Sequence, residues 1–257
     1  DFENLPPEAL VVILAERLDM LTGFFGIEEK PTGSKDPFAL RRAALSVVRL
    51  LAQHKVRCDL TALCAAGLQG YEQGMFKADA QTIANEVANY CWGRLSVILK
   101  EQGIAYDIVD AVKPKENEVL TMDIPDSATR ADALQQFLNT KEGAELKEAY
   151  KRAKNVLDKA DGEVTTSVDN ALFETEAEKM LDGELNSVRD TIGDMLAQEN
   201  YAKVMEMLAQ LHQPVATFFD EVMVMADDDN VRKNRLALLN MMVEEFDRVA
   251  DFGKLSG

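Results

Sequence analysis

The chain has 257 residues, enough for one large or two smaller domains, and its composition, 47% hydrophobic and 28% charged, is that of an ordinary globular protein. Its 28 lysines and arginines face 45 aspartates and glutamates, a formal net charge of −17, so the chain as a whole is unsuited to bind nucleic acid or an anionic membrane. Any such binding must be local. Apolar runs such as residues 10–15 are far shorter than the roughly 20 residues of a membrane span, which predicts no transmembrane segment.

The first residues, Asp1-Phe2-Glu3-Asn4, include no Met, basic region or cleavage site. This start is typical of an internal piece of a longer cytoplasmic protein and not of a secreted one. Cys58, Cys64 and Cys91 form an odd set without a C-x-x-C pair. We expect free, partly buried thiols, with a metal or disulfide role as the alternative.

Apolar residues recur at helical spacing along nearly the whole chain, and strand-like alternation is almost absent. The first amphipathic segment is carried by Leu10, Leu14, Leu18, Leu21 and Phe25. Further on, Asp36 followed by Pro37 predicts a second helix with Asp36 as its N-cap and Pro37 at its first position.

Residues 113–126 contain two prolines and many charges without helical periodicity, which predicts a connector. We therefore expect a helical domain over residues 1–112, the connector and a first helix over 113–139, and a second helical domain over 140–257. Net charge differs across this point, because most of the excess of acidic residues lies after residue 112.

In the second half, Thr175 and Glu178 have the spacing of a capping box, and the helix that follows has its apolar stripe at Leu181, Leu185, Val188, Ile192 and Leu196. Together with the earlier segments, this pattern predicts an all-α protein: a multi-helix bundle of about ten helices in two helical subdomains.

A last helix of about twenty residues is predicted before Gly253, with a stripe that runs from Val231 to Val249. The acids at 227–229 suit its N-terminus better than a metal site. Arg235 interrupts the stripe, which indicates either a buried ion pair or a functional cleft. Six methionines in this half are expected to fill the core, with an adaptable partner surface as the alternative: Met205, Met207, Met223, Met225, Met241 and Met242.

Signatures of catalysis are missing. His54 and His212 stand in no metal-binding or His-Asp pattern, and the sequence has no phosphate-binding glycine loop or G-x-S-x-G motif. We therefore expect no catalytic and no metal-binding residue in this chain.

Three clusters of basic residues run against the global charge. Residues 30–57 carry seven basic side chains and the single acid Asp36, with Arg42 and Arg49 on one helix face. Weaker clusters lie at residues 147–159 and 232–235. Each cluster predicts a phosphate-binding surface, and the alternative is that the cations pair with carboxylates inside the fold.

Two sequence blocks resemble a known family. Residues 218–228, Arg232, residues 234–239 and residues 248–251 resemble the C-terminus of the bacterial glycyl-tRNA synthetase beta subunit, a DALR-type anticodon-binding domain that is also found in arginyl-tRNA synthetases. Gly26-Ile27 and residues 31–45 resemble the HD-like helical region of the same subunit, and Lys151-Arg152 with residues 155–157 fits as well. Residues 1–112 then correspond to the C-terminal part of the HD-like region and residues 140–257 to the DALR-type domain.

The resemblance implies a tRNA-binding portion of glycine–tRNA ligase, a class II aminoacyl-tRNA synthetase of protein biosynthesis. Its implied partners are tRNA-Gly, the alpha subunit and a second beta subunit, in a tetramer of two alpha and two beta subunits, with no DNA and no membrane. The fragment itself needs no cofactor, since ATP with Mg serves the alpha subunit. The candidate RNA-binding residues are Lys35, Arg41, Arg42, Arg49, Lys151, Arg152, Lys154, Asn155, Arg232, Lys233, Asn234 and Arg235.

Physically, basic side chains would hold phosphates while unpaired anticodon bases are read by the helices after residue 140. Two other interpretations remain open: a structural helical adaptor that never touches RNA, and a degenerate phosphohydrolase, against which the missing His-Asp pair counts.

Overall fold

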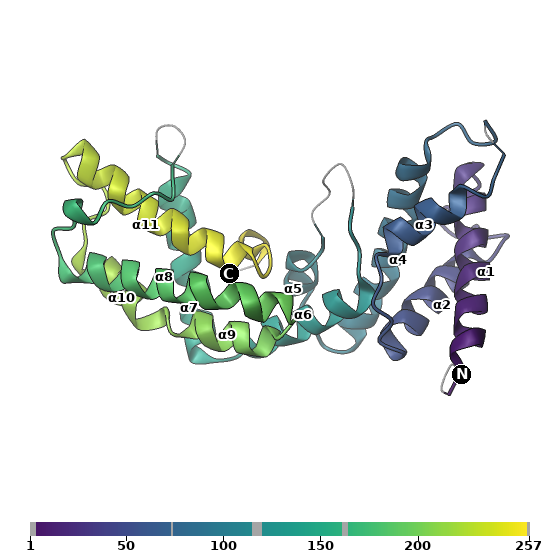
Figure 1. The fold of residues 1–257 in the computed structure, drawn as a ribbon, viewed down its shortest axis with the longest axis horizontal. Helices are drawn as coiled ribbons and strands as arrows, with labels where there is room; N and C mark the ends of the chain where they lie inside the picture. Colours follow the sequence, from purple (N-terminus) through teal and green to yellow (C-terminus); the bar gives the residue numbers. More distant parts are fainter. Residues whose placement is uncertain (1–3, 73, 115–119, 161–163, 256–257) are drawn as a thin grey trace. The chain divides into compact units, whose positions relative to one another are not determined.

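A computed structural model of the chain describes residues 4–72, 74–114, 120–160 and 164–255 (Figure 1). These residues form the α-helices α1 to α11 and two short 3-10 helices, η1 and η2, and they contain no strand beyond an isolated bridge between Thr32 and Lys35. The all-α prediction is confirmed.

The chain packs as two compact units, one made of residues 1–104 and 113–129 and the other of residues 105–112 and 130–257. The predicted domain boundaries after residues 112 and 139 stay a prediction. Of the predicted connector, residues 115–119 lie outside the described residues, and its last three residues are helical, because α6 begins at Ile124. Proline is tolerated there, since the first turn of a helix needs no N–H donor.

Unit 1 is a helical bundle. It contains α1 (Pro7–Gly26), α2 (Leu40–Gln53), α3 (Leu60–Leu68), α4 (Ala80–Glu101) and the first residues of α6 (Ile124–Leu138). Helix α1 packs against α2, α3 and α4, and α4 also contacts α2 and α3 (Figure 1). The core includes Leu21, Val47, Leu60 and Leu95, all fully buried.

The first predicted helix is confirmed as α1, with four of its five stripe residues buried. The predicted start of the second helix is wrong. Helix α2 begins at Leu40, because Ala39 adopts a left-handed conformation with φ 57°. Asp36 still caps the helix from a distance, since its carboxylate accepts hydrogen bonds from the backbone N–H groups of Leu40 at 2.8 Å and Arg41 at 3.0 Å.

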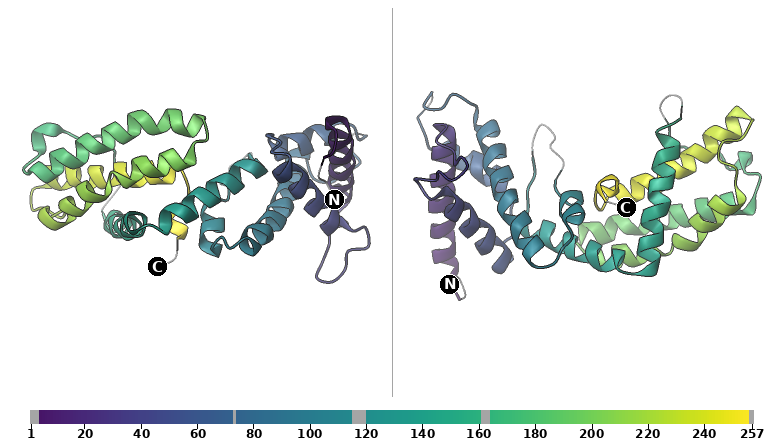
Figure 2. Two further views of the ribbon diagram at one scale, coloured as in Figure 1. Left: turned by 90° about the horizontal axis from the view of Figure 1, so that it is seen from below. Right: turned by 180° about the vertical axis from the view of Figure 1, so that it is seen from behind.

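Unit 2 is a second helical bundle (Figure 2). Its elements are α5 (Tyr106–Ala111), the remainder of α6, α7 (Lys141–Leu157), η1 (Asn170–Leu172), α8 (Glu176–Ala197), α9 (Tyr201–Ala209), α10 (His212–Glu221), α11 (Asp229–Asp247) and η2 (Phe252–Lys254). Helix α11 packs on α7 and α8, while α10 packs on the same two helices. The rings of Tyr150, Phe246 and Phe252 form a buried aromatic cluster that joins α7, α11 and η2.

Both predicted helix starts in this unit are confirmed. Thr175 and Glu178 form a complete capping box at the start of α8. The Asp228 side chain caps α11 by accepting from the N–H groups of Asn230 and Val231. The methionines divide: Met205, Met241 and Met242 are buried, whereas Met223 and Met225 are exposed.

The three cysteines are free, as predicted; Cys64 and Cys91 are buried and Cys58 is half-buried. Among the described residues, no helix combines the length and apolar character that crossing a membrane requires.

Candidate nucleic-acid interface

Eleven of the twelve candidate residues lie on three helices, and Lys35 lies in the loop before the first of them. The α2 set comprises Lys35, Arg41, Arg42 and Arg49 in unit 1. The α7 set comprises Lys151, Arg152, Lys154 and Asn155, and the α11 set Arg232, Lys233, Asn234 and Arg235, both in unit 2.

The α2 set exposes cations that the fold does not use. Arg42 and Arg49 are exposed and lie on one face of α2, and Lys35 is exposed in the loop before it. Within the described residues, none of these three side chains makes a hydrogen bond or ion pair. Arg41 differs, because its guanidinium donates to the backbone carbonyl of Gly33. Three exposed positive charges of this set are therefore available to an anion.

Other cations of the same stretch pair internally. Lys30 lies 2.7 Å from Glu86, and Arg57 lies 2.9 Å from Asp123. Internal pairing thus accounts for part of this basic stretch, but not for the face of α2.

The α7 set lies on the outer side of a well-anchored helix. Thr140 caps its start by accepting from the Gly143 N–H at 3.0 Å, and Tyr150 faces the core. Lys151 lies 3.5 Å from Glu148. The side chains of Lys154 and Asn155 are exposed and have no hydrogen-bond or ionic partner within the part of the chain that the structure describes.

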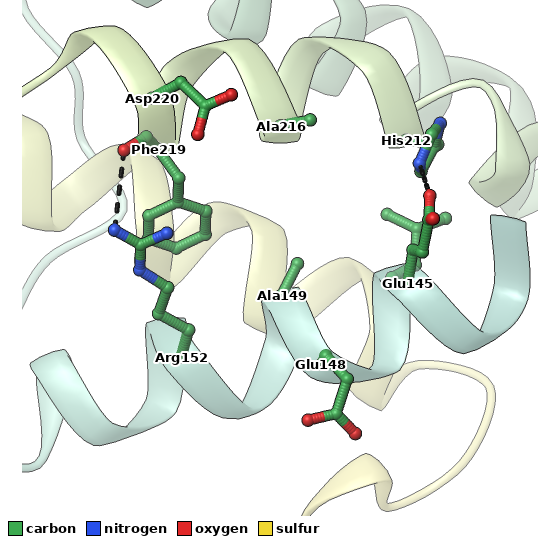
Figure 3. A pocket seen from close by; sticks show the side chains of 9 residues that line it. Glu145, Glu148, Ala149, Arg152, His212, Ala216, Phe219 and Asp220 are labelled. Carbon is green, nitrogen blue, oxygen red and sulfur yellow. Dashed lines mark hydrogen bonds and ion pairs between the residues drawn. The ribbon is translucent and has the colours of Figure 1, made fainter.

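A groove of about 300 Å³ runs between α7 and α10 (Figure 3). Near one end, the guanidinium carbon of Arg152 lies over the Phe219 ring, 4.2 Å from the ring centre. The Arg152 Nη2 donates a hydrogen bond to the Phe219 carbonyl at 3.4 Å. At the other, His212 Nε2 and Glu145 are hydrogen bonded. The groove is lined by Glu145, Leu146, Glu148, Ala149, Arg152, His212, Ala216, Phe219 and Asp220.

The carboxylates of this groove differ in their partners. Glu145 pairs with His212, and Glu148 with Lys151. Asp220 is exposed, and its carboxylate accepts no hydrogen bond and forms no ion pair among the described residues.

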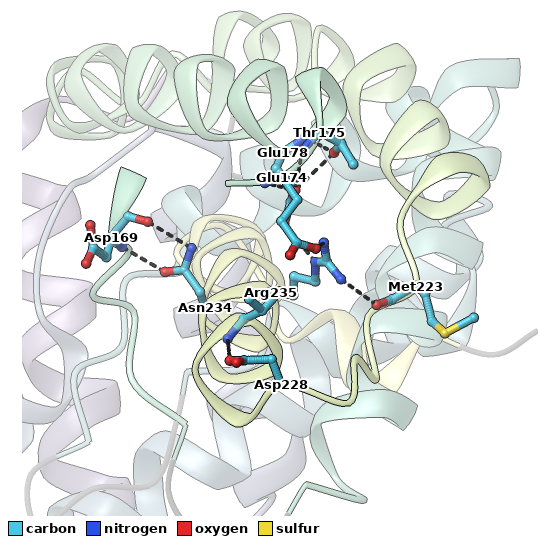
Figure 4. A network of polar contacts seen from close by, with 9 residues as sticks. Asp169, Glu174, Thr175, Glu178, Met223, Asp228, Asn234 and Arg235 are labelled. Atoms are coloured by element: carbon cyan, nitrogen blue, oxygen red, sulfur yellow. Dashed lines mark hydrogen bonds and ion pairs between the residues drawn. The ribbon is translucent and has the colours of Figure 1, made fainter. Parts of the chain in front are cut away.

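The α11 set is built into the fold around Arg235 (Figure 4). The Arg235 guanidinium donates from Nε to Glu178 and from Nη2 to Glu174, both at 2.7 Å, and from Nη1 to the Met223 carbonyl at 3.1 Å. Only 5% of Arg235 is exposed. Of the two alternatives that the sequence left open for Arg235, the structure has the buried ion pair.

Burial acts to raise the pKa of Glu178, but hydrogen bonds from Arg235 and from the N–H groups of Glu174 and Thr175 outweigh it and hold the pKa below its ordinary value. Burial acts to lower the pKa of Arg235, but its hydrogen bonds to the carboxylates of Glu178 and Glu174, and their negative charges, outweigh it and raise the pKa. Both groups therefore stay charged, which is the condition for a stable buried pair.

The other members of this set are also engaged. Arg232 donates to the Ala226 carbonyl at 2.7 Å and to Asp229 at 2.5 Å, and Lys233 lies 2.6 Å from Asp229. The Asn234 amide exchanges two hydrogen bonds with the backbone of Asp169, at 2.7 and 3.0 Å. Whether any of the twelve residues contacts RNA stays a prediction.

Sequence reasoning missed the partners in these sites. Glu178 was marked by its capping box, but nothing in the sequence linked it to Arg235, 57 positions away. Phe219 and Asp220 were part of a family block without a role, and Asp169 and Glu174 carried no signal at all.

A second hollow, of about 260 Å³, lies in unit 1 between α1 and the side chains of Tyr71, Met75 and Phe76. This hollow is lined by Asp19, Met20, Gly23, Phe24, Ile27, Tyr71, Met75 and Phe76. The lining has no lysine or arginine, so it has no cationic side chain that could bind a phosphate. Within the described ranges, no three His, Cys, Asp or Glu side chains gather as a metal site.

Residues 4–114 match the sequence model of the family described as glycyl-tRNA synthetase beta subunit, and residues 146–247 match that of the DALR anticodon binding domain. Among curated proteins, the chain is 38% identical over 256 residues to the glycine–tRNA ligase beta subunit of Cereibacter sphaeroides. It is 35% identical to that of Shewanella halifaxensis and 38% identical to that of Chromohalobacter salexigens, each over 249 residues. These matches cover 97–98% of this chain but only 35–36% of each relative, so the chain spans about a third of their length.

Proposed function

Because the chain belongs to the glycyl-tRNA synthetase beta subunit family, we propose that it is a tRNA-binding part of a glycine–tRNA ligase, and that it recognises tRNA-Gly. The observation that carries this proposal is the set of exposed, unpartnered cations on α2. In a chain with 45 acidic residues, Lys35, Arg42 and Arg49 have no carboxylate partner among the described residues. Phosphate is the anion that such a face suits.

The two helical units would divide the work. The α2 set, with Lys154 of α7, would contact phosphates and fix the position of the RNA, whereas unit 2, which contains the anticodon-binding match, would read unpaired bases. The charge of −17 would repel RNA from the remaining surface and so disfavour non-specific binding. The α11 set would hold the fold of unit 2 together.

The remaining partners are proposals as well. An alpha subunit would activate glycine with ATP and Mg, in an assembly of two alpha and two beta subunits in the cytoplasm. This chain would contribute binding and no catalytic group. The whole ligase would be a class II aminoacyl-tRNA synthetase.

Binding of the 257-residue chain to tRNA-Gly and to a non-cognate tRNA, measured between 50 and 200 mM salt, tests the proposal. We expect tighter binding to tRNA-Gly and an affinity that falls steeply with salt, by roughly a thousandfold for about six phosphate contacts. The double variant Arg42→Gln/Arg49→Gln removes two of these contacts, so its slope of log affinity against log salt is expected to be smaller by about two.

The matched control is Lys30→Gln/Lys77→Gln. It removes the same charge from unit 1, but at cations that already pair with Glu86 and Glu28. The control is expected to keep most of the slope. Binding that is absent, or independent of salt, would contradict the proposal and favour a structural adaptor that never touches RNA.

A further inference from the structure

We propose that the α7–α10 groove binds one unpaired nucleobase that carries an exocyclic amino group, with Arg152 and Phe219 as its stacking platform and Asp220 as the acceptor of its amino hydrogens. This inference rests on the proposed function, because it assumes that unit 2 meets single-stranded RNA, and it assigns the chemistry of one subsite.

The first step is the stacked pair of side chains. The guanidinium carbon of Arg152 lies over the Phe219 ring, 4.2 Å from the ring centre. Arg152 is exposed, so its opposite face is available to a second planar group. Unpaired bases stack on arginine planes as well as on aromatic rings, and this stacking tolerates any base. The pair is held across two helices by the hydrogen bond from Arg152 to the Phe219 carbonyl (Figure 3).

The second step is the charge of the groove. Three carboxylates line it, those of Glu145, Glu148 and Asp220, against the cations Arg152 and, when protonated, His212. A phosphate would be repelled there, whereas a neutral base would not. Lys154, which is exposed and has no partner among the described residues, lies outside the groove lining and is the cation of α7 that would meet phosphates. The groove therefore suits a nucleobase whose sugar-phosphate backbone stays outside it.

The third step is the free acceptor. Glu145 already pairs with His212 and Glu148 with Lys151, but Asp220 has no partner within the described residues. A carboxylate can only accept hydrogen bonds, so it pairs with an amino group such as N4 of cytosine and is repelled by O4 of uracil. Asp220 borders the Arg152–Phe219 pair in the same groove, which places acceptor and platform together (Figure 3).

The test compares fluorescently labelled 12-residue oligocytidylate and oligouridylate, which share length and phosphate charge. The intact 257-residue chain is expected to bind oligocytidylate about tenfold more tightly by fluorescence anisotropy. Asp220→Asn should abolish this preference, because an amide can accept from N4 of cytosine and donate to O4 of uracil equally well. Glu221→Gln is the matched control: it changes the same charge at the neighbouring position, outside the groove lining, and should keep the preference.

The platform has its own test. Arg152→Lys keeps the charge but loses the plane, so the affinity for oligocytidylate should fall about tenfold, while Lys151→Arg on the same helix should change it little. Circular dichroism checks that each variant keeps its helices.

Equal binding of the two oligonucleotides by the unaltered chain, including no binding of either, would overturn the inference, and so would a preference that survives Asp220→Asn. Titration with tRNA-Gly in the same buffer separates the two proposals. If tRNA binds but the oligonucleotides are not distinguished, only the groove assignment fails. If tRNA does not bind either, the proposed function fails with it.

Discussion

The Arg235 guanidinium lies 2.7 Å from the Glu178 carboxylate, and the two side chains are 6% and 0% exposed. Glu178 also completes the capping box of α8, where its side chain accepts from the N–H groups of Glu174 and Thr175 at 2.9 and 2.8 Å. One carboxylate thus joins the start of α8 to Arg235 in the first half of α11.

Breaking the pair on one side should destabilise unit 2 strongly. Glu178→Ala leaves the Arg235 charge buried opposite a missing partner, and we expect the free energy of unfolding in urea to fall by about 3–5 kcal/mol. The double change Glu178→Leu/Arg235→Met removes both charges, so it should lower the free energy of unfolding by clearly less. Glu176→Gln, at a carboxylate 84% exposed in the same helix turn, is the control and should change stability by less than about 1 kcal/mol. Equal losses in the single and double variants would contradict the role of the buried charge.

Acid should weaken the same contact. Since the pKa of Glu178 is held below its ordinary 4.5, the unfolded chain takes up the proton first as pH falls. The stability that Glu178 contributes is therefore complete above about pH 4.5 and is lost as the pH falls through the lower pKa of the folded state. Unfolding free energies measured from pH 7 down to pH 3 should fall less steeply in Glu178→Gln than in the unaltered chain. Parallel curves would show that this carboxylate is not the titrating group.

The buried thiols should be inert in the native chain. Burial raises the pKa of Cys64 from 9.0 to about 12, and it raises the pKa of Cys91 as well. At pH 8 the thiolate fraction of Cys64 is then roughly a thousandfold below that of an ordinary cysteine, and the thiolate is the reactive form. Mass spectrometry after brief iodoacetamide treatment should find Cys64 and Cys91 unmodified until urea is added. Rapid labelling of Cys91 in the folded chain would contradict the burial of its thiol.

The start of α2 should depend on Asp36. Asp36→Ala removes the acceptor of the Leu40 and Arg41 N–H groups, and we expect a loss of about 1 kcal/mol in the free energy of unfolding. Asp36→Asn keeps an acceptor oxygen and should lose less. An unchanged stability in Asp36→Ala would mean that water replaces the cap at no cost.

Local signals in the sequence were sufficient for the elements of the fold. The apolar stripe from Leu10 to Phe25 and the capping box at Thr175 predicted α1 and α8 correctly, because a helix face and a cap depend on residues only three or four positions apart. The same logic was wrong by three residues at α2. There, Ala39 turns the chain before the helix begins, and no propensity of alanine indicates a left-handed residue.

The sequence by itself determined that this is an all-helical, acidic chain with three basic clusters, and the resemblance in its blocks pointed to the families whose sequence models match residues 4–114 and 146–247. Which cations remain available was decided only by the tertiary structure. Arg235 is joined to Glu178 across 57 positions and Arg152 to Phe219 across 67, whereas Arg42 and Arg49 meet no partner among the described residues. The reason is physical: a charge is neutralised by what lies within a few ångströms of it, and packing between helices, not order along the chain, sets those neighbours.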